Sequence, residues 1–171
     1  MKKNSKKVAL TGILLALAII IGTIENHIPP IIPSLPFVKI GFSNVVLIFS
    51  SLTLGLIPTI IIASIKSIIV PIFMGNPMMI AYSLSASLIA VSLSYLLLYT
   101  KKFGIPTIAI VGAIAHNLVQ LCVASLIMSN IFVFGFIPYL TATGFIAGLV
   151  TGIISYLLIR YMPPKVMFLE S

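Results

Sequence analysis

The stretch "IPTIAIVGAIAHNLVQLCVASLIMS", residues 105–129, decides the fold of this chain. It exceeds the roughly 20 residues that a helix needs to cross a bilayer, and it contains no lysine, arginine, aspartate or glutamate. Its centre nevertheless holds His116, Asn117 and Gln120, side chains that lipid cannot satisfy with hydrogen bonds. The stretch therefore predicts a membrane-spanning helix whose polar patch faces the protein interior.

The composition of the whole chain agrees with this reading. Of its 171 residues, 60% are hydrophobic and 7% are charged, whereas a soluble domain carries about 25% charged residues. A small soluble domain could not build a polar surface from so few charges. We expect an all-α integral membrane protein in which residues 1–171 form a single membrane domain.

Prolines, glycines and charged residues divide the chain into six apolar segments. Four prolines between residues 29 and 36 separate the first two segments, because proline cannot continue a helix. We expect six transmembrane helices in one bundle, at about 8–24, 40–55, 58–72, 78–99, 105–129 and 137–161. The second and third are shorter than a straight span requires, so they are expected to be tilted, broken or partly re-entrant.

The basic residues predict the orientation of the bundle. Eight of the ten lie at the chain ends and between the fourth and fifth segments: Lys2, Lys3, Lys6, Lys7, Lys101, Lys102, Arg160 and Lys165. Six spans place all of these on one side, which the positive-inside rule identifies as the cytoplasm, with both termini there. The net charge of +8 then reflects membrane topology, since no basic stretch with interleaved aromatic residues suggests a nucleic-acid surface.

The polar residues of segment 105–129 share one helical face. His116 and Gln120 are four residues apart, and Asn117 and Gln120 are three apart, so these side chains are neighbours on a helix. One interpretation is a hydrogen-bonded clasp between helices, a common use of membrane amides. The other is the wall of a binding cavity.

Lys66, midway along the third segment, favours the cavity, although a lysine can also snorkel to an interface. Of the two carboxylates, only Glu25 lies on the outer side, where it could form an ion pair with Lys66 or Lys39 but could not neutralise both. One cation is left for a ligand. We therefore expect an outward-facing cavity for an anionic small molecule, lined by Lys39, Asn44, Lys66, His116, Asn117 and Gln120.

Several other functions are excluded or disfavoured. The chain has no GxxxxGK[ST] motif, so it does not use ATP through a P-loop. One cysteine and two separated histidines do not predict a metal site. Two glutamates on opposite sides of a membrane cannot hold the Mg²⁺ that diphosphate chemistry needs. We expect no catalytic activity and no cofactor.

Two segments carry a resemblance to a known family. "FVKIGFSNVVLIF", residues 37–49, and "GAIAHNLVQL", residues 112–121, resemble the bacterial membrane family described either as heptaprenyl diphosphate synthase component I or as the Gx transporter family. That family is similar to the S components of energy-coupling factor (ECF) transporters. These are six-helix proteins that capture a vitamin-like solute from outside, then dock on a transmembrane coupling protein that carries two ATPases. The resemblance implies the bacterial cytoplasmic membrane as the location.

Small residues on the first helix form the docking face of S components. The resemblance assigns that role here to Ala9, Gly12 and Ala16. A second series of small residues recurs every four positions in the sixth segment, at Gly144, Gly148 and Gly152. Such residues allow close approach of helices, either inside the bundle or against a second membrane protein.

Three functions follow from these patterns. The first is the substrate-binding subunit of an ATP-driven transporter for a vitamin-like or anionic solute. The second is a non-catalytic membrane subunit that recruits a prenyl diphosphate synthase of isoprenoid or menaquinone synthesis. The third is a self-sufficient secondary carrier that uses Glu25 or His116 for protons. An outward cavity favours solute capture, whereas a lateral or cytoplasmic opening favours a lipid product.

Overall fold

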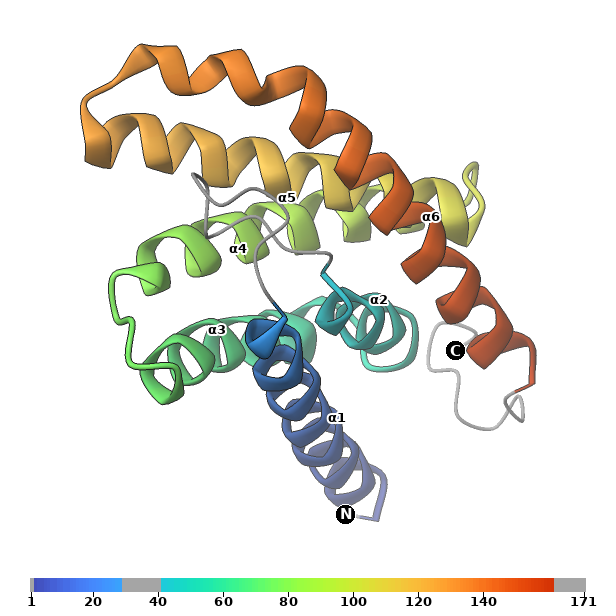
Figure 1. The fold of residues 1–171 in the computed structure, drawn as a ribbon. Helices are drawn as coiled ribbons and strands as arrows, with labels where there is room; N and C mark the ends of the chain where they lie inside the picture. The colour runs from blue at the N-terminus through green and yellow to red at the C-terminus, as the bar shows by residue number, and fades with distance from the viewer. Residues whose placement is uncertain (1, 29–40, 162–171) are drawn as a thin grey trace.

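The computed structural model describes residues 2–28 and 41–161, and every regular element in this part of the chain is helical (Figure 1). The elements are α1 (Lys2–His27), α2 (Ser43–Thr53), α3 (Leu56–Phe73), α4 (Met79–Tyr99), α5 (Ile105–Met128), the 3₁₀ helix η1 (Ile131–Phe136) and α6 (Ile137–Arg160). Helices α3 to α6 begin and end within two residues of the predicted positions. Helix α1 is longer than predicted.

Five helical segments are long and apolar enough to cross a membrane: α1, α3, α4, α5 and the combined η1–α6 segment. The second helix is not, because its 11 residues extend only about 16 Å at 1.5 Å per residue. Gly41 precedes α2 and Gly55 follows it. Their φ angles of +82° and +84° are positive, a conformation that glycine adopts more readily than other residues. The fold is thus a helical protein with several membrane-crossing helices, and the predicted sixth span is not confirmed.

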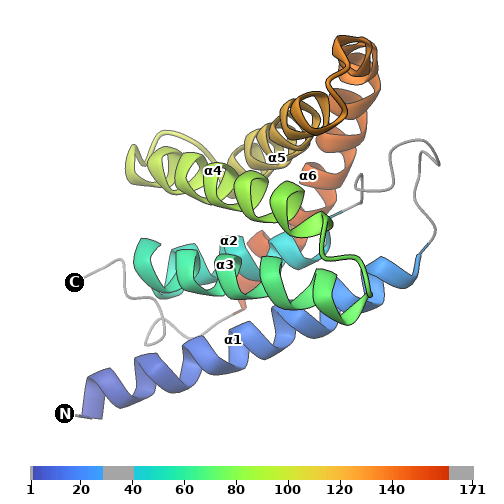
Figure 2. The same ribbon diagram turned by 90° about the vertical axis from the view of Figure 1, so that its left-hand side faces the viewer.

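The helices neighbour one another in a closed ring, in the order α1, α3, α4, α5, α6, α2 and back to α1. Figures 1 and 2 show α5 and α6 side by side along their length and α1 running beneath α3. Helix α2 contacts both α1 and α6, and residues of its first turn line the inside of the ring. Side chains from all six α-helices can therefore reach one interior space.

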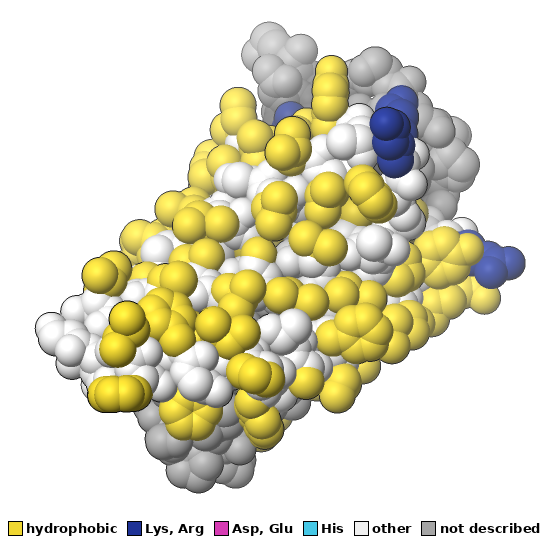
Figure 3. All heavy atoms as spheres, turned by 90° about the horizontal axis from the view of Figure 1, so that it is seen from above, with side chains coloured by type: hydrophobic (Ala, Val, Ile, Leu, Met, Phe, Trp, Pro, Cys, Tyr) yellow, Lys and Arg dark blue, Asp and Glu magenta, His cyan; other side chains and the backbone are white. Residues whose placement is uncertain are grey.

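Apart from the buried Lys66, the lysine and arginine residues that the structure describes lie toward one end of this ring, called the basic end below. Helix α2 brings the chain back to the level of the first turns of α1. Pro58, at the start of α3, therefore lines the same groove as Lys7 and Gly12. Helix α4 then runs back to the Lys101–Lys102 turn, which lies on the same left-hand side of Figure 2 as the N-terminus. Lysine and arginine side chains gather at one end of the apolar surface in Figure 3.

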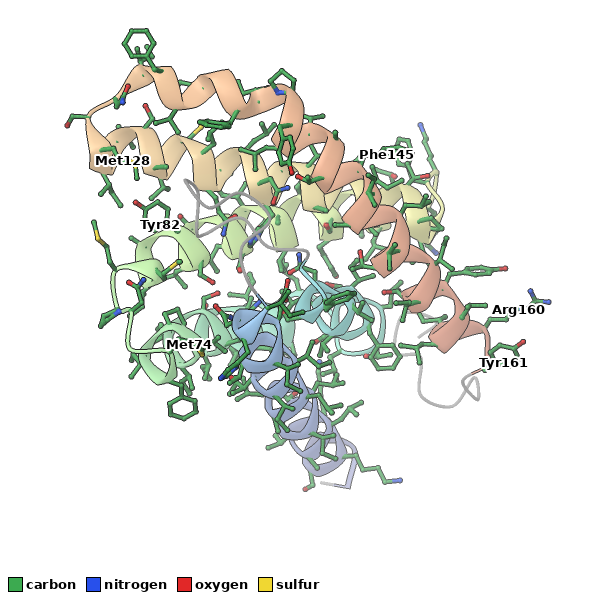
Figure 4. All side chains as sticks on the ribbon, in the orientation of Figure 1. Met74, Tyr82, Met128, Phe145, Arg160 and Tyr161 are labelled. Carbon is green, nitrogen blue, oxygen red and sulfur yellow. The ribbon has the colours of Figure 1, made fainter. Side chains whose placement is uncertain are left out.

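Helix α6 finishes at Arg160, which Figure 4 shows on the opposite side of the molecule from Met74 and Tyr82. A small cluster of buried residues around Tyr82 and Leu121 fills the end opposite the basic end. A larger cluster around Leu14, Phe49 and Ile62 joins α1, α2 and α3 nearer the basic end. The interior between these clusters holds the polar residues.

Glycines of α6 form a close seam with α5. A Cβ atom on Gly148 would lie 2.5 Å from the Ile110 Cα, and one on Gly152 would lie 2.6 Å from the Pro106 Cα. Such contacts exclude any side chain, so the two backbones approach closely here. Of the two interpretations of this glycine series, packing inside the bundle is the one the structure shows.

Candidate functional site

A polar cavity lies in the ring, on the side away from the basic end. All six α-helices contribute to its lining, and it measures about 80 Å³. Since one water needs about 10–15 Å³ by this kind of measure, it has room for several water-sized groups. Five of the predicted site residues line it: Asn44, Lys66, His116, Asn117 and Gln120. The sixth, Lys39, lies outside the described residues.

Lys66 enters the cavity from α3 and is 6% exposed. Its ammonium donates a 2.9 Å hydrogen bond to the Ser43 hydroxyl, in the first turn of α2. The N-terminus of a helix carries partial positive charge, so a cation there is electrostatically unfavourable. Lys66 and the N-terminus of α2 therefore both contribute positive potential at the same place in the cavity. An anionic group bound there would be attracted by both.

Glu25 enters the same cavity from the last turns of α1 and is also 6% exposed. Its carboxylate accepts a hydrogen bond from the Gly41 backbone N–H. The positive φ of Gly41 belongs to the turn that leads into α2, so Glu25 ties the end of α1 to this turn. Glu25 and Lys66 attract each other electrostatically, but no hydrogen bond or ion pair joins them within the described residues.

The lining thus carries one charge of each sign in the described part of the chain. The sequence predicted a positive cavity from Lys39 and Lys66 together. That prediction now depends on Lys39, which lies outside the described residues. What the structure brings together is a cation on α3 and an anion on the neighbouring helix α1, in one small cavity.

Asn117 and Gln120 have different surroundings, although both are buried on α5. The Asn117 amide donates a 3.0 Å hydrogen bond to the Leu140 carbonyl of α6. For Asn117, the interpretation as a clasp between helices is therefore correct. The Gln120 Oε1 and the His116 Nδ1 are buried without a hydrogen-bond partner among the residues that the structure describes. The clasp does not account for these two atoms.

Buried polar atoms without partners are uncommon, because each costs about 1–3 kcal/mol of desolvation that no hydrogen bond offsets. Gln120 is 6% exposed and borders the cavity. His116 borders it too, and its imidazole also interacts with the Ala86 backbone on α4. These two side chains give the cavity hydrogen-bonding capacity that the described protein does not use.

A second, smaller space continues from the polar cavity toward the basic end and is called the lower chamber here. It measures about 30 Å³ and shares Asn44, Ala113 and His116 with the polar cavity. Its other lining residues come from α2, α4 and α5, among them Leu47, Ile48, Ser51, Ser87, Ala90 and Val91. The Ser51 hydroxyl donates to the Leu47 carbonyl, and Ser87 accepts from Ser67. With these hydroxyls occupied, the chamber is largely apolar.

The predicted docking residues lie outside the cavity. Ala9, Gly12 and Ala16 are exposed along α1, and a Cβ atom on Gly12 would meet nothing within 4 Å. A shallow groove of about 560 Å³ runs beside them, between α1 and the start of α3. These small residues therefore do not pack within the bundle, in contrast to the glycines of α6.

Sequence reasoning missed Ser43, Tyr82 and Ser83, all of which line the polar cavity. A buried lysine needs an acceptor, and Ser43 stands directly before Asn44, so it was a reasonable candidate. Tyr82 and Ser83 gave no such signal, because serine and tyrosine are common in apolar helices. Among the described residues, no group of three histidine, cysteine, aspartate or glutamate side chains could hold a metal ion.

Comparison with known protein families assigns the chain to one of them. A family model described as heptaprenyl diphosphate synthase component I matches residues 14–158. No curated protein matches the chain at significant similarity. The matched region extends over most of the sequence and contains every described residue that lines the polar cavity, from Gly22 to Ala147. The chain therefore belongs to the heptaprenyl diphosphate synthase component I family.

Proposed function

We propose that this protein binds a small, polar, anionic or vitamin-like solute in its polar cavity, as the substrate-binding subunit of an ATP-driven transporter. The observation that carries the proposal is the cavity itself. It lies away from the basic end, and it contains buried polar atoms of His116 and Gln120 that have no partner in the described protein. A ligand that donates and accepts hydrogen bonds would satisfy them.

The direction of the cavity supports solute capture. Basic residues favour the cytoplasmic ends of membrane helices, so Lys7, the Lys101–Lys102 turn and Arg160 support a cytoplasmic location for the basic end. The cavity then opens toward the outside. In a bacterial cytoplasmic membrane, that is the side from which a scarce solute is taken up. A cytoplasmic or lateral opening would have suited a lipid product better.

The chain has no ATP-binding motif, so energy must come from other subunits. The exposed small residues Ala9, Gly12 and Ala16, beside the groove between α1 and α3, fit the docking of a second membrane protein. A transmembrane coupling protein with two ATPases is the partner set that the similarity to S components implies. The solute-loaded bundle would reorient when these ATPases act.

In this proposal the chain has no catalytic role. Glu25 is the only carboxylate that the structure describes, and it holds the Gly41 N–H. A single carboxylate in that position cannot assemble the Mg²⁺ site that diphosphate condensation uses. The protein would hold and orient its solute through hydrogen bonds and charge alone.

Bound solute is the direct test. The full chain is extracted in mild detergent, transferred to nanodiscs and examined by native mass spectrometry with Lys66→Met as the comparison. We expect the wild-type protein to retain a small molecule that the variant loses. A wild-type protein without retained solute, which also gains none from its host's growth medium, would contradict the proposal.

A second candidate function follows from the name of the family. The chain could recruit a soluble prenyl diphosphate synthase as its non-catalytic membrane subunit. Affinity purification from host membranes separates the two candidates. Co-purified ATPases with a second membrane protein support the transporter subunit, and a co-purified prenyl synthase supports the alternative.

A further inference from the structure

The polar cavity carries two opposite charges that do not neutralise each other by direct contact. Lys66 uses one hydrogen bond on Ser43, and an ammonium has three donors. Glu25 accepts from the Gly41 N–H, and a carboxylate can accept several hydrogen bonds. Within the described residues, no other hydrogen bond of either charged group is present. Each charge therefore retains capacity for a ligand.

The uncharged groups of the cavity add a requirement. Gln120 Oε1 is an acceptor, so it needs an N–H or O–H donor from the occupant. Glu25 also needs a donor, whereas Lys66 and the start of α2 need an acceptor. An anion alone would satisfy Lys66, but it would leave Gln120 Oε1 without a donor and Glu25 with only the Gly41 N–H. The occupant must present a donor group and an anionic group close together.

The lower chamber adds a third requirement. It adjoins the polar cavity at Asn44, Ala113 and His116, which line both spaces, and at about 30 Å³ it has room for roughly two or three water-sized groups. Two of its three serine hydroxyls, those of Ser51 and Ser87, are hydrogen-bonded within the protein and most of its other lining residues are apolar, so an apolar group would fit. The occupant thus has a compact apolar part attached to its polar end.

We infer that the solute is a small zwitterion with a compact apolar substituent, of the chemical type of an α-amino acid. Its anionic group binds Lys66 at the start of α2, its ammonium group donates to Glu25 and Gln120, and its apolar group enters the lower chamber. This inference rests on the proposed function and specifies its solute class. The cavities have no room for a long prenyl chain.

Four matched probes test the class. L-norvaline carries all three features, pentanoate lacks the ammonium, n-butylamine lacks the carboxylate, and glycine lacks the apolar chain. The readout is the rise in melting temperature of the full chain in nanodiscs, converted to affinity by mass action. We expect norvaline to bind about tenfold more tightly than each of the other three, the effect of one lost charge-assisted contact or a few buried methylenes.

Two variants locate the contacts. Glu25→Gln keeps an oxygen for the Gly41 N–H but removes the charge, so the preference for norvaline over pentanoate should disappear. Ala90→Val narrows the lower chamber, so norvaline should lose its advantage over glycine. Ala81→Val makes the same change on the exposed face of α4 and should leave all four affinities unchanged.

The outcomes separate this inference from the proposed function. If pentanoate binds as tightly as norvaline, the site reads only an anion and the zwitterion is wrong, although solute binding stands. If no probe binds while native mass spectrometry shows a retained solute, the amino-acid type is wrong. Unchanged preferences in both Glu25→Gln and Ala90→Val would also overturn the inference.

Discussion

The Lys66 ammonium donates a 2.9 Å hydrogen bond to the Ser43 hydroxyl, which places a buried cation at the positive end of α2. Without an anion this arrangement costs free energy, since burial and the helix end both disfavour the charge. A buried cation in this position is what a binding site for an anionic group would require.

Replacing Lys66 should separate stability from binding. In Lys66→Met the buried ammonium is gone while the side-chain volume is largely kept, and Glu25 loses an electrostatic partner but no direct ion pair, so the melting temperature should change little. Solute retention should fall at least about tenfold, because one charge-assisted contact is lost. Lys66→Arg, which keeps the charge, serves as the control and should retain more solute than Lys66→Met. A Met variant that holds solute as well as wild type would contradict this role.

Asn117 and Gln120 offer a matched pair on α5. Asn117→Leu removes one hydrogen bond to the Leu140 carbonyl, which keeps the Thr143 hydroxyl as a donor, so the free energy of unfolding should fall by about 0.5–1.5 kcal/mol. Gln120→Leu removes an oxygen that has no partner, so stability should be unchanged or higher. Thermal unfolding in nanodiscs measures both variants. Only Gln120→Leu should reduce solute retention without lowering the melting temperature. Equal destabilisation by the two substitutions would contradict the different roles assigned to Asn117 and Gln120.

The two groups of small residues should respond differently to alanine. Gly148→Ala places a Cβ atom 2.5 Å from the Ile110 Cα, so α5 and α6 must separate, at a cost of about 1–3 kcal/mol. Gly12→Ala meets open space and should be neutral or stabilise α1 by up to about 1 kcal/mol. Melting temperatures of both variants check the contrast. A stable Gly148→Ala protein would show that the seam is loose.

A larger side chain at Gly12 should affect the partner and not the solute. Gly12→Leu would cover the groove between α1 and α3 and hinder a docked helix. We expect reduced co-purification of the coupling protein and ATPases, with solute retention equal to wild type. Ile13→Leu, a nearly isosteric change at an exposed neighbouring position, is the control. Full recovery of the partners with Gly12→Leu would remove α1 as the docking face.

Much of this molecule could be predicted from hydropathy and spacing. Helix spacing alone brought His116, Asn117 and Gln120 onto one face, and the scarcity of carboxylates directed attention to Lys66. The length of α2 could not be predicted as well, because residues 40–55 contain no charged residue or proline and Gly55 gives a weak boundary. An apolar sequence does not indicate where a backbone turns away from a helix.

Pairings between helices were also beyond the sequence. Asn117 bonds to Leu140 while Gln120, three residues later, has an acceptor without a partner, and only the positions of neighbouring helices decide this. The same holds for Ser43, which accepts from Lys66 across 23 positions of sequence. The glycine series of α6 predicted a close contact with another helix, but it did not identify α5 as that helix.

The most direct test of the account is whether the polar cavity opens on the side opposite the basic end. Ser83→Cys, in a Cys122→Ser background, places one thiol in the cavity lining, and Thr100→Cys places one beside the Lys101–Lys102 turn. Intact cells are treated with a membrane-impermeant methanethiosulfonate. The account predicts modification of Ser83→Cys in intact cells and of Thr100→Cys only after permeabilisation. Modification of Ser83→Cys only after permeabilisation would contradict an outward solute site.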